Sequence, residues 1–247
     1  MLRNLRRYLN RLVRRGPGAK LCGLSAADWG LVDRLRSMNL TYLSDARLAS
    51  LCSTCRAIEQ ACLPGVFIEA GCALGGSTVL ISTVKSHVRP LLVYDVFGMI
   101  PPPSDEDPQE VHERYRAIVT GVSKGIGGDK YYGYEANLRE LVRANLQAFA
   151  VDCEAQSVSL IMGLLQDTMV IDQQVAFAHI DVDWYEPVMT CLQRILPRLV
   201  PGGSVILDDY HDWAGCRKAA DEYLRGWPGH FCLDDSAGSM KITRVAS

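Results

Sequence analysis

The chain has 247 residues, of which 48% are hydrophobic and 22% are charged, and its formal net charge is -2. These values are typical of a globular α/β domain with additions. They argue against a dedicated nucleic-acid binder, which would carry a strong basic excess, and no apolar run approaches the roughly 20 residues that span a bilayer.

The first 20 residues are strongly basic, with seven Lys or Arg and no acid. Four leucines lie roughly on one helical face and predict a basic amphipathic helix: Leu2, Leu5, Leu9 and Leu12. This helix is either a membrane-surface or targeting segment, or a solvated arm that packs on a neighbouring subunit. The short apolar face, which lacks Trp and Phe, favours the arm.

Two further helices are predicted between Ser25 and Leu63, the first capped by Asp28 and the second by Ser44, with a stop at 64–65. We therefore divide the chain into an N-terminal helical extension, 1–63, and a main domain, 64–247. Cys52 and Cys55 form a C-x-x-C without a second pair, which is weak support for a redox or metal role. The nine cysteines show no paired framework and no secretory signal precedes them, so we expect reduced thiols in the cytoplasm.

The stretch VFIEAGCALGGSTVLIS predicts a short strand, a glycine-rich turn and a new helix. Glu69 ends the strand, glycines 71, 75 and 76 make the turn, and Ser77 and Thr78 close it. Glycines let a ligand approach the backbone, and the helix N-terminus offers free N–H groups. This is the nucleotide-binding opening of a doubly wound sheet, although it is neither G-x-G-x-x-G nor a P-loop. The anionic Glu69 suits a cationic or hydroxyl-rich ligand better than a pyrophosphate.

A second strand, 90–96, ends at Asp95, which lies 26 residues after Glu69. In doubly wound folds an acid at this position binds the hydroxyls of an adenosine ribose. The alternative is a cap or turn residue, and the glycine turn one strand earlier favours the ribose interpretation.

A long insertion, 98–137, follows Asp95. It holds a proline-rich loop, a helix predicted over 110–120, and a glycine-rich segment with Tyr131, Tyr132 and Tyr134. Insertions of this length in compact domains are usually functional, so we predict a mobile lid over the ligand-binding edge, with a partner-binding loop as the alternative. Helical spacing then resumes from residue 138 and leads to a third strand, 157–162. The turn after it directs Leu164, Leu165 and Asp167 to the same edge.

Two apolar segments, 175–182 and 203–207, are predicted strands, and each ends in a pair of acids: Asp181 with Asp183, and Asp208 with Asp209. The helical pattern between them predicts a right-handed crossover, which places both pairs at one carboxyl edge. Four carboxylates that repel one another need a cation or shifted pKa values. Oxygen ligands favour Mg²⁺, Mn²⁺ or Ca²⁺ over zinc. The alternative is that Asp183 or Asp209 merely caps the following helix.

The end of the chain predicts a helix from Trp213 to Trp227 and a hairpin that adds an antiparallel strand. The predicted fold is therefore a doubly wound, mainly parallel α/β sheet with an antiparallel C-terminal strand.

Several of these strings occur together in one known family: FIEAGCALGGS, YDVFGMIPPP, HIDVDWYEP, and PGGSVILDDY with GCRKAADEY. Over about residues 40 to 230 the chain resembles the macrocin O-methyltransferase family. The resemblance implies a class I methyltransferase-like (Rossmann-like) fold and transfer of a methyl group from S-adenosylmethionine to a sugar hydroxyl of a natural-product glycoside, with a divalent metal. The expected partner is this small acceptor, with no nucleic acid, and a homo-oligomer is possible.

The resemblance also implies roles for individual residues. Asp181, Asp208 and Asp209 would bind Mg²⁺, and Asp183 would be the general base. S-adenosylmethionine would lie along the following positions: Glu69, Gly71, Ala73, Gly75, Ser77, Thr78, Asp95, Val96, Gly163 and Asp181.

The chain departs from the family pattern in the insertion and at Val96, Val182 and Trp184, where the family commonly has Ser, a small residue and Met. A catechol acceptor stays open because the tyrosines of the insertion and Trp184 would suit a flat aromatic ring. His211 or Asp212 could serve as another base. A metal-dependent nucleotide-binding hydrolase, or a noncatalytic binding module, is the interpretation from a different class.

Overall fold

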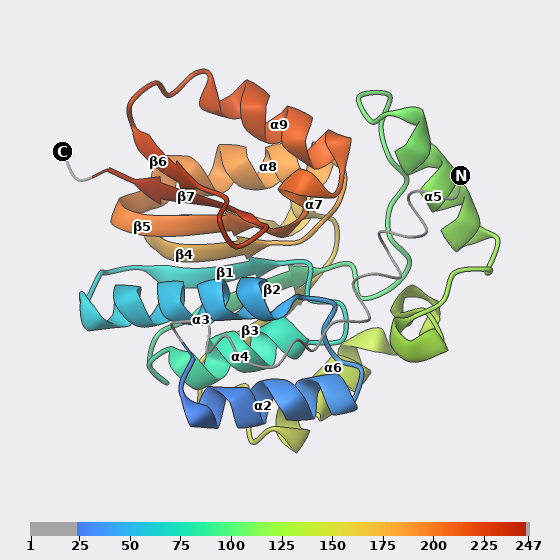
Figure 1. Ribbon diagram of the computed structural model, residues 1–247, viewed down its shortest axis with the longest axis horizontal. Helices are drawn as coiled ribbons and strands as arrows, with labels where there is room; N and C mark the ends of the chain where they lie inside the picture. Colours follow the sequence, from blue (N-terminus) through green and yellow to red (C-terminus); the bar gives the residue numbers. More distant parts are fainter. Residues whose placement is uncertain (1–23, 246–247) are drawn as a thin grey trace.

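The computed structural model describes residues 24–245 and shows a three-layer α/β arrangement (Figure 1). The basic helix predicted near the N-terminus lies outside these residues. The central sheet has seven strands in the order β3-β2-β1-β4-β5-β7-β6, and β7 runs antiparallel to both of its neighbours. The predicted mainly parallel sheet and the added antiparallel strand are confirmed. The strands are β1 (Val66–Ala70), β2 (Leu91–Asp95), β3 (Val158–Met162), β4 (Val175–Ile180), β5 (Leu199–Leu207), β6 (Phe231–Asp234) and β7 (Met240–Arg244).

Helices cover both faces of the sheet (Figure 1). One face packs against α2 (Ala26–Ser37), α3 (Asp45–Gln60), α4 (Gly76–Val84) and α6 (Leu138–Ala148). The other face packs against α7 (Leu165–Thr168), α8 (Tyr185–Ile195) and α9 (Ala214–Leu224). Helix α5 (Gln109–Val119) belongs to the insertion and stands on the side where the parallel strands end. The described part of the chain also contains short 3-10 turns: η1 (Ile126–Gly128), η2 (Tyr132–Tyr134), η3 (Leu196–Arg198) and η4 (Asp208–His211).

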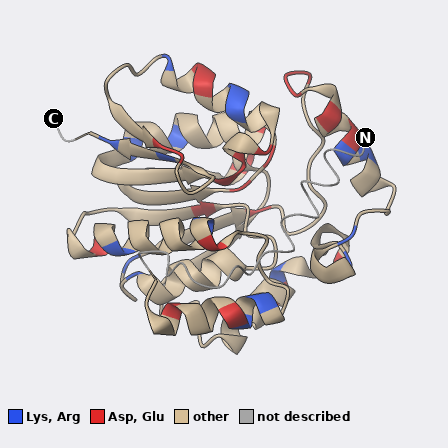
Figure 2. Cartoon of the chain, in the orientation of Figure 1, with Lys and Arg blue, Asp and Glu red and all other residues tan. Residues whose placement is uncertain are grey.

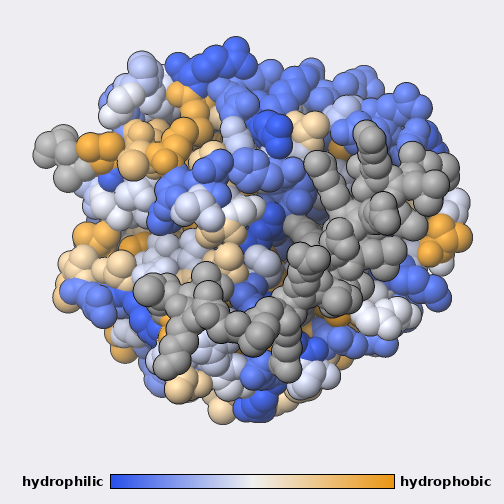
Figure 3. All heavy atoms as spheres, viewed as in Figure 1, coloured by the Kyte–Doolittle hydropathy of each residue, from blue (hydrophilic) through white to orange (hydrophobic). Residues whose placement is uncertain are grey.

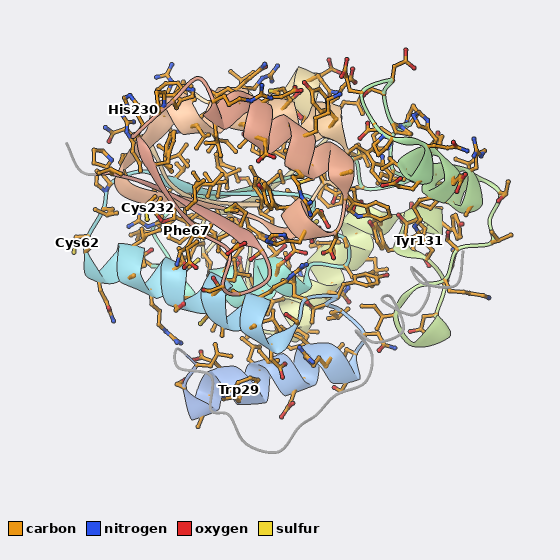
Figure 4. All side chains as sticks on the ribbon, turned by 45° about the horizontal axis from the view of Figure 1, so that its top comes forward. Trp29, Cys62, Phe67, Tyr131, His230 and Cys232 are labelled. Atoms are coloured by element: carbon orange, nitrogen blue, oxygen red, sulfur yellow. The ribbon has the colours of Figure 1, made fainter. Side chains whose placement is uncertain are left out.

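The central strands are buried on both faces, which explains why they read as continuous apolar runs. Phe67 of β1 and Phe177 of β4 point to the same side of the sheet, with ring centroids 5.2 Å apart. Phe67 lies between the sheet and α3 (Figure 4). Ile68 and Ala178, one residue further along each strand, face the opposite helix layer. The parallel pairing of β1 with β4, in which Ala70 lies opposite Ile180, holds the carboxyl ends of these strands side by side.

The N-terminal helices share the core of the main domain. Val32 and Leu35 of α2, and Leu48 of α3, have no exposed surface and belong to the same apolar cluster as Phe67. Helix α2 begins after Ser25, whose side chain accepts from the Asp28 N–H while Asp28 accepts from the Ser25 N–H. The prediction of Asp28 as the cap was therefore wrong: it is the acidic partner of a capping box.

The second helix agrees with the prediction at its start and differs at its end. Ser44 caps α3 by accepting from the Arg47 N–H. The helix ends at Gln60, before the predicted stop at 64–65, because Cys62 takes a left-handed conformation with φ 51°. Within this helix Cys52 and Cys55 are buried; burial raises the pKa of Cys52 to about 11 and that of Cys55 well above its usual range. Thiols held protonated do not support a redox role.

Several strand limits also differ from the prediction. The strand before the first acid pair, β4, ends at Ile180 instead of the predicted Val182, and β5 starts at Leu199 instead of Gly203.

Among residues 24–245 no helix is both long enough and apolar enough to span a membrane. The surface around β6 and β7 carries apolar side chains (orange, upper left in Figure 3), including Leu233 and Val245, which are about half exposed.

Candidate active site

The two acid pairs meet where β4 and β5 end. The two strands are hydrogen-bonded neighbours in parallel register, with Ile180 opposite Leu207. Figure 2 shows acidic segments gathered at this edge, facing α5. Carboxylate oxygens of Asp181, Asp183 and Asp209 lie within 4.8 Å of one another, and those of Asp208, Asp209 and Asp212 form a second such group. The predicted convergence is present, with Asp209 shared by both groups.

The acid cluster is electrostatically costly, as its pKa values show. Burial, followed by the charge of Asp181, raises the pKa of Asp183 to about 7, although Arg114 opposes this shift. Burial and the charges of Asp183 and Asp181 hold the pKa of Asp209 well above its usual range. Both shifts have the cause predicted from the sequence, crowded carboxylates removed from water. A divalent cation would relieve this repulsion.

One basic side chain reaches the cluster from the N-terminal helices. Arg47 is only 8% exposed, and its Nη1 donates to Asp208 Oδ2 at 2.7 Å. Its Nη2 donates to Asp212 Oδ2 at 2.7 Å and to the Gly238 carbonyl at 2.6 Å. An arginine in the first turn of a helix is unfavourable for the helix dipole, so its position depends on these distant partners. Arg47 thus joins α3, the two acids Asp208 and Asp212 at the ends of η4, and the β6–β7 turn.

The candidate base, Asp183, has a constrained backbone. Its φ is 58°, in the left-handed region that costs a residue with a side chain roughly 1–2 kcal/mol. Its N–H donates to Asp209 Oδ2 at 3.2 Å, and the neighbouring Trp213 side chain opposes the rise in its pKa. The conformation turns the chain sharply between β4 and α8 and brings Asp183 beside Asp209.

The glycine-rich turn lies directly against the acidic edge. Gly71 has φ 80°, and a Cβ built on it would stand 2.0 Å from the Asp181 carbonyl oxygen, so a side chain is excluded there. Asp95 Oδ2 accepts from the Cys72 N–H at 2.8 Å, and Oδ1 accepts from the Phe97 N–H at 2.7 Å. Asp95 therefore fastens the turn after β1 to the end of β2.

A cavity of about 1120 Å³ opens between this turn, the acid cluster and the insertion. Pockets for one drug-sized ligand measure about 300–1,000 Å³, so this cavity has room for a cofactor and an acceptor together. Of the residues predicted from the sequence, these line it: Gly71, Ala73, Asp95, Val96, Gly163, Asp181, Asp183, Asp208 and Asp209.

Four predicted cofactor residues lie behind the cavity wall. Glu69 has no exposed surface; it accepts from the Thr78 hydroxyl at 2.5 Å and contacts His179 Nδ1 at 3.2 Å. Although burial opposes it, this contact with Glu69 raises the pKa of His179. Gly75 and Ser77 are buried at the start of α4. The structure thus shows these residues supporting the glycine turn, and their contact with a cofactor stays a prediction.

The insertion forms the opposite wall of the cavity. Tyr131 and Tyr132 line it, and Figure 4 places Tyr131 in the insertion, away from Cys62 and Cys232. Tyr134 instead donates to the Ile118 carbonyl at 2.5 Å and accepts from the Ser123 N–H at 3.2 Å. Its hydroxyl therefore fastens the end of α5 to the following loop. The predicted closing motion stays a prediction.

Some of the other residues predicted to reach this edge line the cavity, and others do not. Leu164 and Leu165 line the cavity as expected, whereas Asp167 lies on the surface away from it. His211 reaches the cavity wall and pairs with Asp235 at 3.2 Å. The sequence interpretation missed Arg47, and it missed Arg114 and Trp213 as neighbours of Asp183. No local motif marks these residues, since each comes from an element distant in sequence.

Comparison with known proteins places the chain in a family. The model of the macrocin O-methyltransferase family matches residues 24–226. The chain belongs to this family. Two curated relatives are similar. The 8-demethyl-8-(2,3-dimethoxy-alpha-L-rhamnosyl)-tetracenomycin-C 4'-O-methyltransferase of Streptomyces olivaceus is 31% identical over 74% of this chain and 65% of the relative. The demethyldecarbamoylnovobiocin O-methyltransferase of Streptomyces niveus is 28% identical over 65% of this chain and 58% of the relative. The matches therefore span less than two thirds of the length of these relatives.

Solved structures show the same fold. The O-methyltransferase NovP superimposes with a TM-score of 0.68 at 21% identity, over 87% of this chain and 88% of that chain. A calicheamicin methyltransferase gives a TM-score of 0.57 at 18% identity, over 94% and 99%. The predicted class I methyltransferase fold is confirmed.

Proposed function

We propose that this member of the macrocin O-methyltransferase family transfers a methyl group from S-adenosylmethionine to a sugar hydroxyl of a natural-product glycoside, with the help of Mg²⁺. The observation that carries the proposal is the contact between the glycine turn and the acid cluster, where Gly71 lies against the Asp181 backbone in one shared cavity. One curated relative is named as an O-methyltransferase of a rhamnosyl-tetracenomycin, and the other as an O-methyltransferase of a novobiocin derivative. These names support an acceptor of this class.

The cavity wall formed by Gly71, Ala73 and Asp95 fits S-adenosylmethionine. The absence of a side chain at Gly71 leaves backbone exposed for close approach, and Asp95 carries acceptor oxygens for ribose hydroxyls. The acidic edge beside this wall is compatible with the positive charge of a sulfonium. When bound, S-adenosylmethionine supplies the electrophilic methyl group.

The acids around Asp209 fit a hard divalent cation. Asp209 belongs to two acid groups, one with Asp181 and Asp183 and the other with Asp208 and Asp212, and all of these side chains offer only oxygen ligands. Burial, together with the charges of Asp183 and Asp181, raises the pKa of Asp209, and a cation would neutralise those charges. A bound cation would supply acidification and orientation of a substrate hydroxyl. Arg47 keeps Asp208 in one orientation through Oδ2.

Asp183 is suited to act as the general base. It lines the cavity beside Asp181 and Asp209, and its raised pKa, about 7, suits a group that accepts a proton near neutral pH. The acceptor oxygen forms its bond to the methyl carbon as the bond from that carbon to sulfur breaks, and the hydroxyl proton passes to Asp183. The chain otherwise aligns the two reactants and excludes water from them.

We favour a sugar over a catechol as the acceptor. Two of the aromatic side chains that line the cavity offer a flat ring little open face, since Trp184 is 1% exposed and Tyr131 is 4% exposed, whereas Tyr132 and Trp213 are partly buried. Trp184 is covered by Trp213, at 5.5 Å between ring centroids, and donates to the Pro101 carbonyl.

The eight cysteines of the described chain are free thiols, and we propose a cytoplasmic location on this basis.

Transfer of tritium from labelled S-adenosylmethionine to panels of rhamnosides and catechols, with Mg²⁺ or with a chelator, tests the proposal. We expect Mg²⁺-dependent labelling of a glycoside. In Asp183→Asn, turnover should fall about 100-fold or more while cofactor binding persists, as for a lost general base. The surface variant Asp167→Asn is the matched control and should retain wild-type turnover. An unchanged rate in Asp183→Asn would remove that residue from the mechanism.

A further inference from the structure

Helix α8 starts at Tyr185, two residues after Asp183, and has no side-chain cap of its own, since its N-cap residue is Trp184. The acceptor for its first N–H comes from the insertion instead. Asp107 Oδ1 accepts from the Tyr185 N–H at 2.9 Å. A carboxylate at this position also complements the positive end of the helix dipole. A residue 78 positions earlier in the chain therefore caps the helix that follows the candidate base.

The Asp107 side chain is buried, and contacts with other residues hold its carboxylate in this position. It is 5% exposed, and its other oxygen, Oδ2, accepts from the N–H and the hydroxyl of Ser104, each at 3.1 Å. On its far side it packs against the first turn of α9. A Cβ built on Gly215 would lie 1.9 Å from Asp107 Oδ1 and 3.1 Å from the Tyr185 nitrogen. Only glycine at 215 therefore lets the carboxylate lie between the two helices.

The same segment of the insertion holds the residue between Asp183 and Tyr185. Trp184 Nε1 donates to the Pro101 carbonyl at 3.0 Å, and the Trp184 N–H donates to the Val182 carbonyl at 2.6 Å. Asp183 lies in the middle of this tight turn with its positive φ. A strained residue persists only where its surroundings determine its conformation. Here the two residues after Asp183 are both fixed by the insertion.

We propose that Asp107 is a positioning residue for Asp183: by capping α8 from the insertion, it holds the turn that directs the Asp183 carboxylate into the cavity. Asp107 itself does not line the cavity, so it acts through the backbone of Trp184 and Tyr185. In this proposal, residues 101–107 of the insertion hold the active-site turn around Asp183 in one conformation. The inference rests on the proposed function, in which Asp183 accepts the hydroxyl proton.

A double-mutant cycle tests the inference, with turnover measured by tritium transfer to the acceptor. Asp107→Ala should lower kcat about 10- to 100-fold, since a misplacement near 1 Å costs a well-aligned reaction about that much, and should leave the KM for S-adenosylmethionine unchanged. In an Asp183→Asn background the same substitution should change kcat less than about twofold, because no base is left to position. Equal losses in both backgrounds would overturn the proposal.

Two further variants separate positioning from loss of folding. Asp107→Asn keeps a carbonyl oxygen for the Tyr185 N–H, so it should retain most of the kcat; a loss as large as that of Asp107→Ala would count against the capping role. Gly215→Ala keeps Asp107 but displaces its carboxylate, and should reproduce the kcat loss of Asp107→Ala; a wild-type kcat would contradict the proposal. Glu106→Gln, which alters an exposed neighbour paired with Lys218, is the matched control.

The outcomes also distinguish this inference from the proposed function. A wild-type rate in Asp183→Asn alone would refute Asp183 as the base. A low rate in Asp183→Asn together with a wild-type rate in Asp107→Ala would leave the base in place and refute the positioning role.

Discussion

Replacing Arg47 by Met should destabilise the protein strongly, because it removes a buried cation from three partners. The Arg47 and Asp208 side chains are 9% and 7% exposed, and removing one partner of such a pair costs about 3–5 kcal/mol. Asp212 is 31% exposed, so its pair adds about 1 kcal/mol at most, and the Gly238 carbonyl loses a donor worth about 1 kcal/mol. These contributions share one guanidinium and are not additive, so we expect a loss of about 4 kcal/mol in unfolding free energy.

Urea unfolding followed by circular dichroism, in the presence of a chelator, measures this change. For a domain of this size a 4 kcal/mol loss corresponds to a fall in melting temperature of roughly 8–16 °C. Arg143→Met removes an exposed pair with Glu140 at 3.6 Å and is the matched control, expected within about 0.5 kcal/mol of wild type. Adding Asp208→Asn to Arg47→Met should recover part of the loss, because the buried charge is then also removed. A loss below about 1 kcal/mol, or no recovery in the double variant, would show that the buried pair of Arg47 and Asp208 does not contribute as described.

Two other substitutions test the glycine turn and a buried lysine. Gly71→Ala places a methyl group 2.0 Å from the Asp181 carbonyl oxygen at a positive φ, so we expect a stability loss of about 2–5 kcal/mol in urea unfolding and weaker cofactor binding by calorimetry; wild-type values in both would contradict the close approach. Burial lowers the pKa of Lys85 from 10.5 to about 8. The unfolded chain therefore binds more protons than the folded protein between these values, and Lys85 makes stability rise with pH across that window, by up to about 3 kcal/mol. The difference in unfolding free energy between wild type and Lys85→Met, measured from pH 8 to 10.5, should show this rise, and a flat difference would count against it.

Local sequence patterns predict those parts of the site that come from consecutive strands, turns and helices. The crossover from β4 through α8 to β5 follows from apolar runs and helical spacing, and these patterns alone predict that Asp181 and Asp209 lie at one edge. Gly71 and Asp95 were likewise indicated by their positions, Gly71 in the turn after β1 and Asp95 at the end of β2. In each case strand, turn and helix are consecutive, so residue type and spacing are sufficient.

The parts that were not predicted depend on contacts between distant segments. Arg47 pairs with Asp208 across 161 positions, and Asp107 caps α8 across 78. Neither contact leaves a local signal: Arg47 reads as one charged residue on an amphipathic helix, and Asp107 as one of several acids in a proline-rich loop. Glu69 shows the converse case, since an acid at the carboxyl end of the first strand suggested ligand contact, whereas its oxygens contact Thr78 and His179 in the core.

A titration of Mn²⁺ into chelator-treated protein, followed by electron paramagnetic resonance, tests the metal site without knowledge of the acceptor, because Mn²⁺ prefers the same oxygen ligands as Mg²⁺. We predict one bound Mn²⁺ per chain, displaced by Mg²⁺, retained in Asp167→Asn and lost in Asp209→Asn while S-adenosylmethionine still binds. Failure to bind Mn²⁺, or equal binding by Asp209→Asn, would contradict a metal site at the ends of β4 and β5.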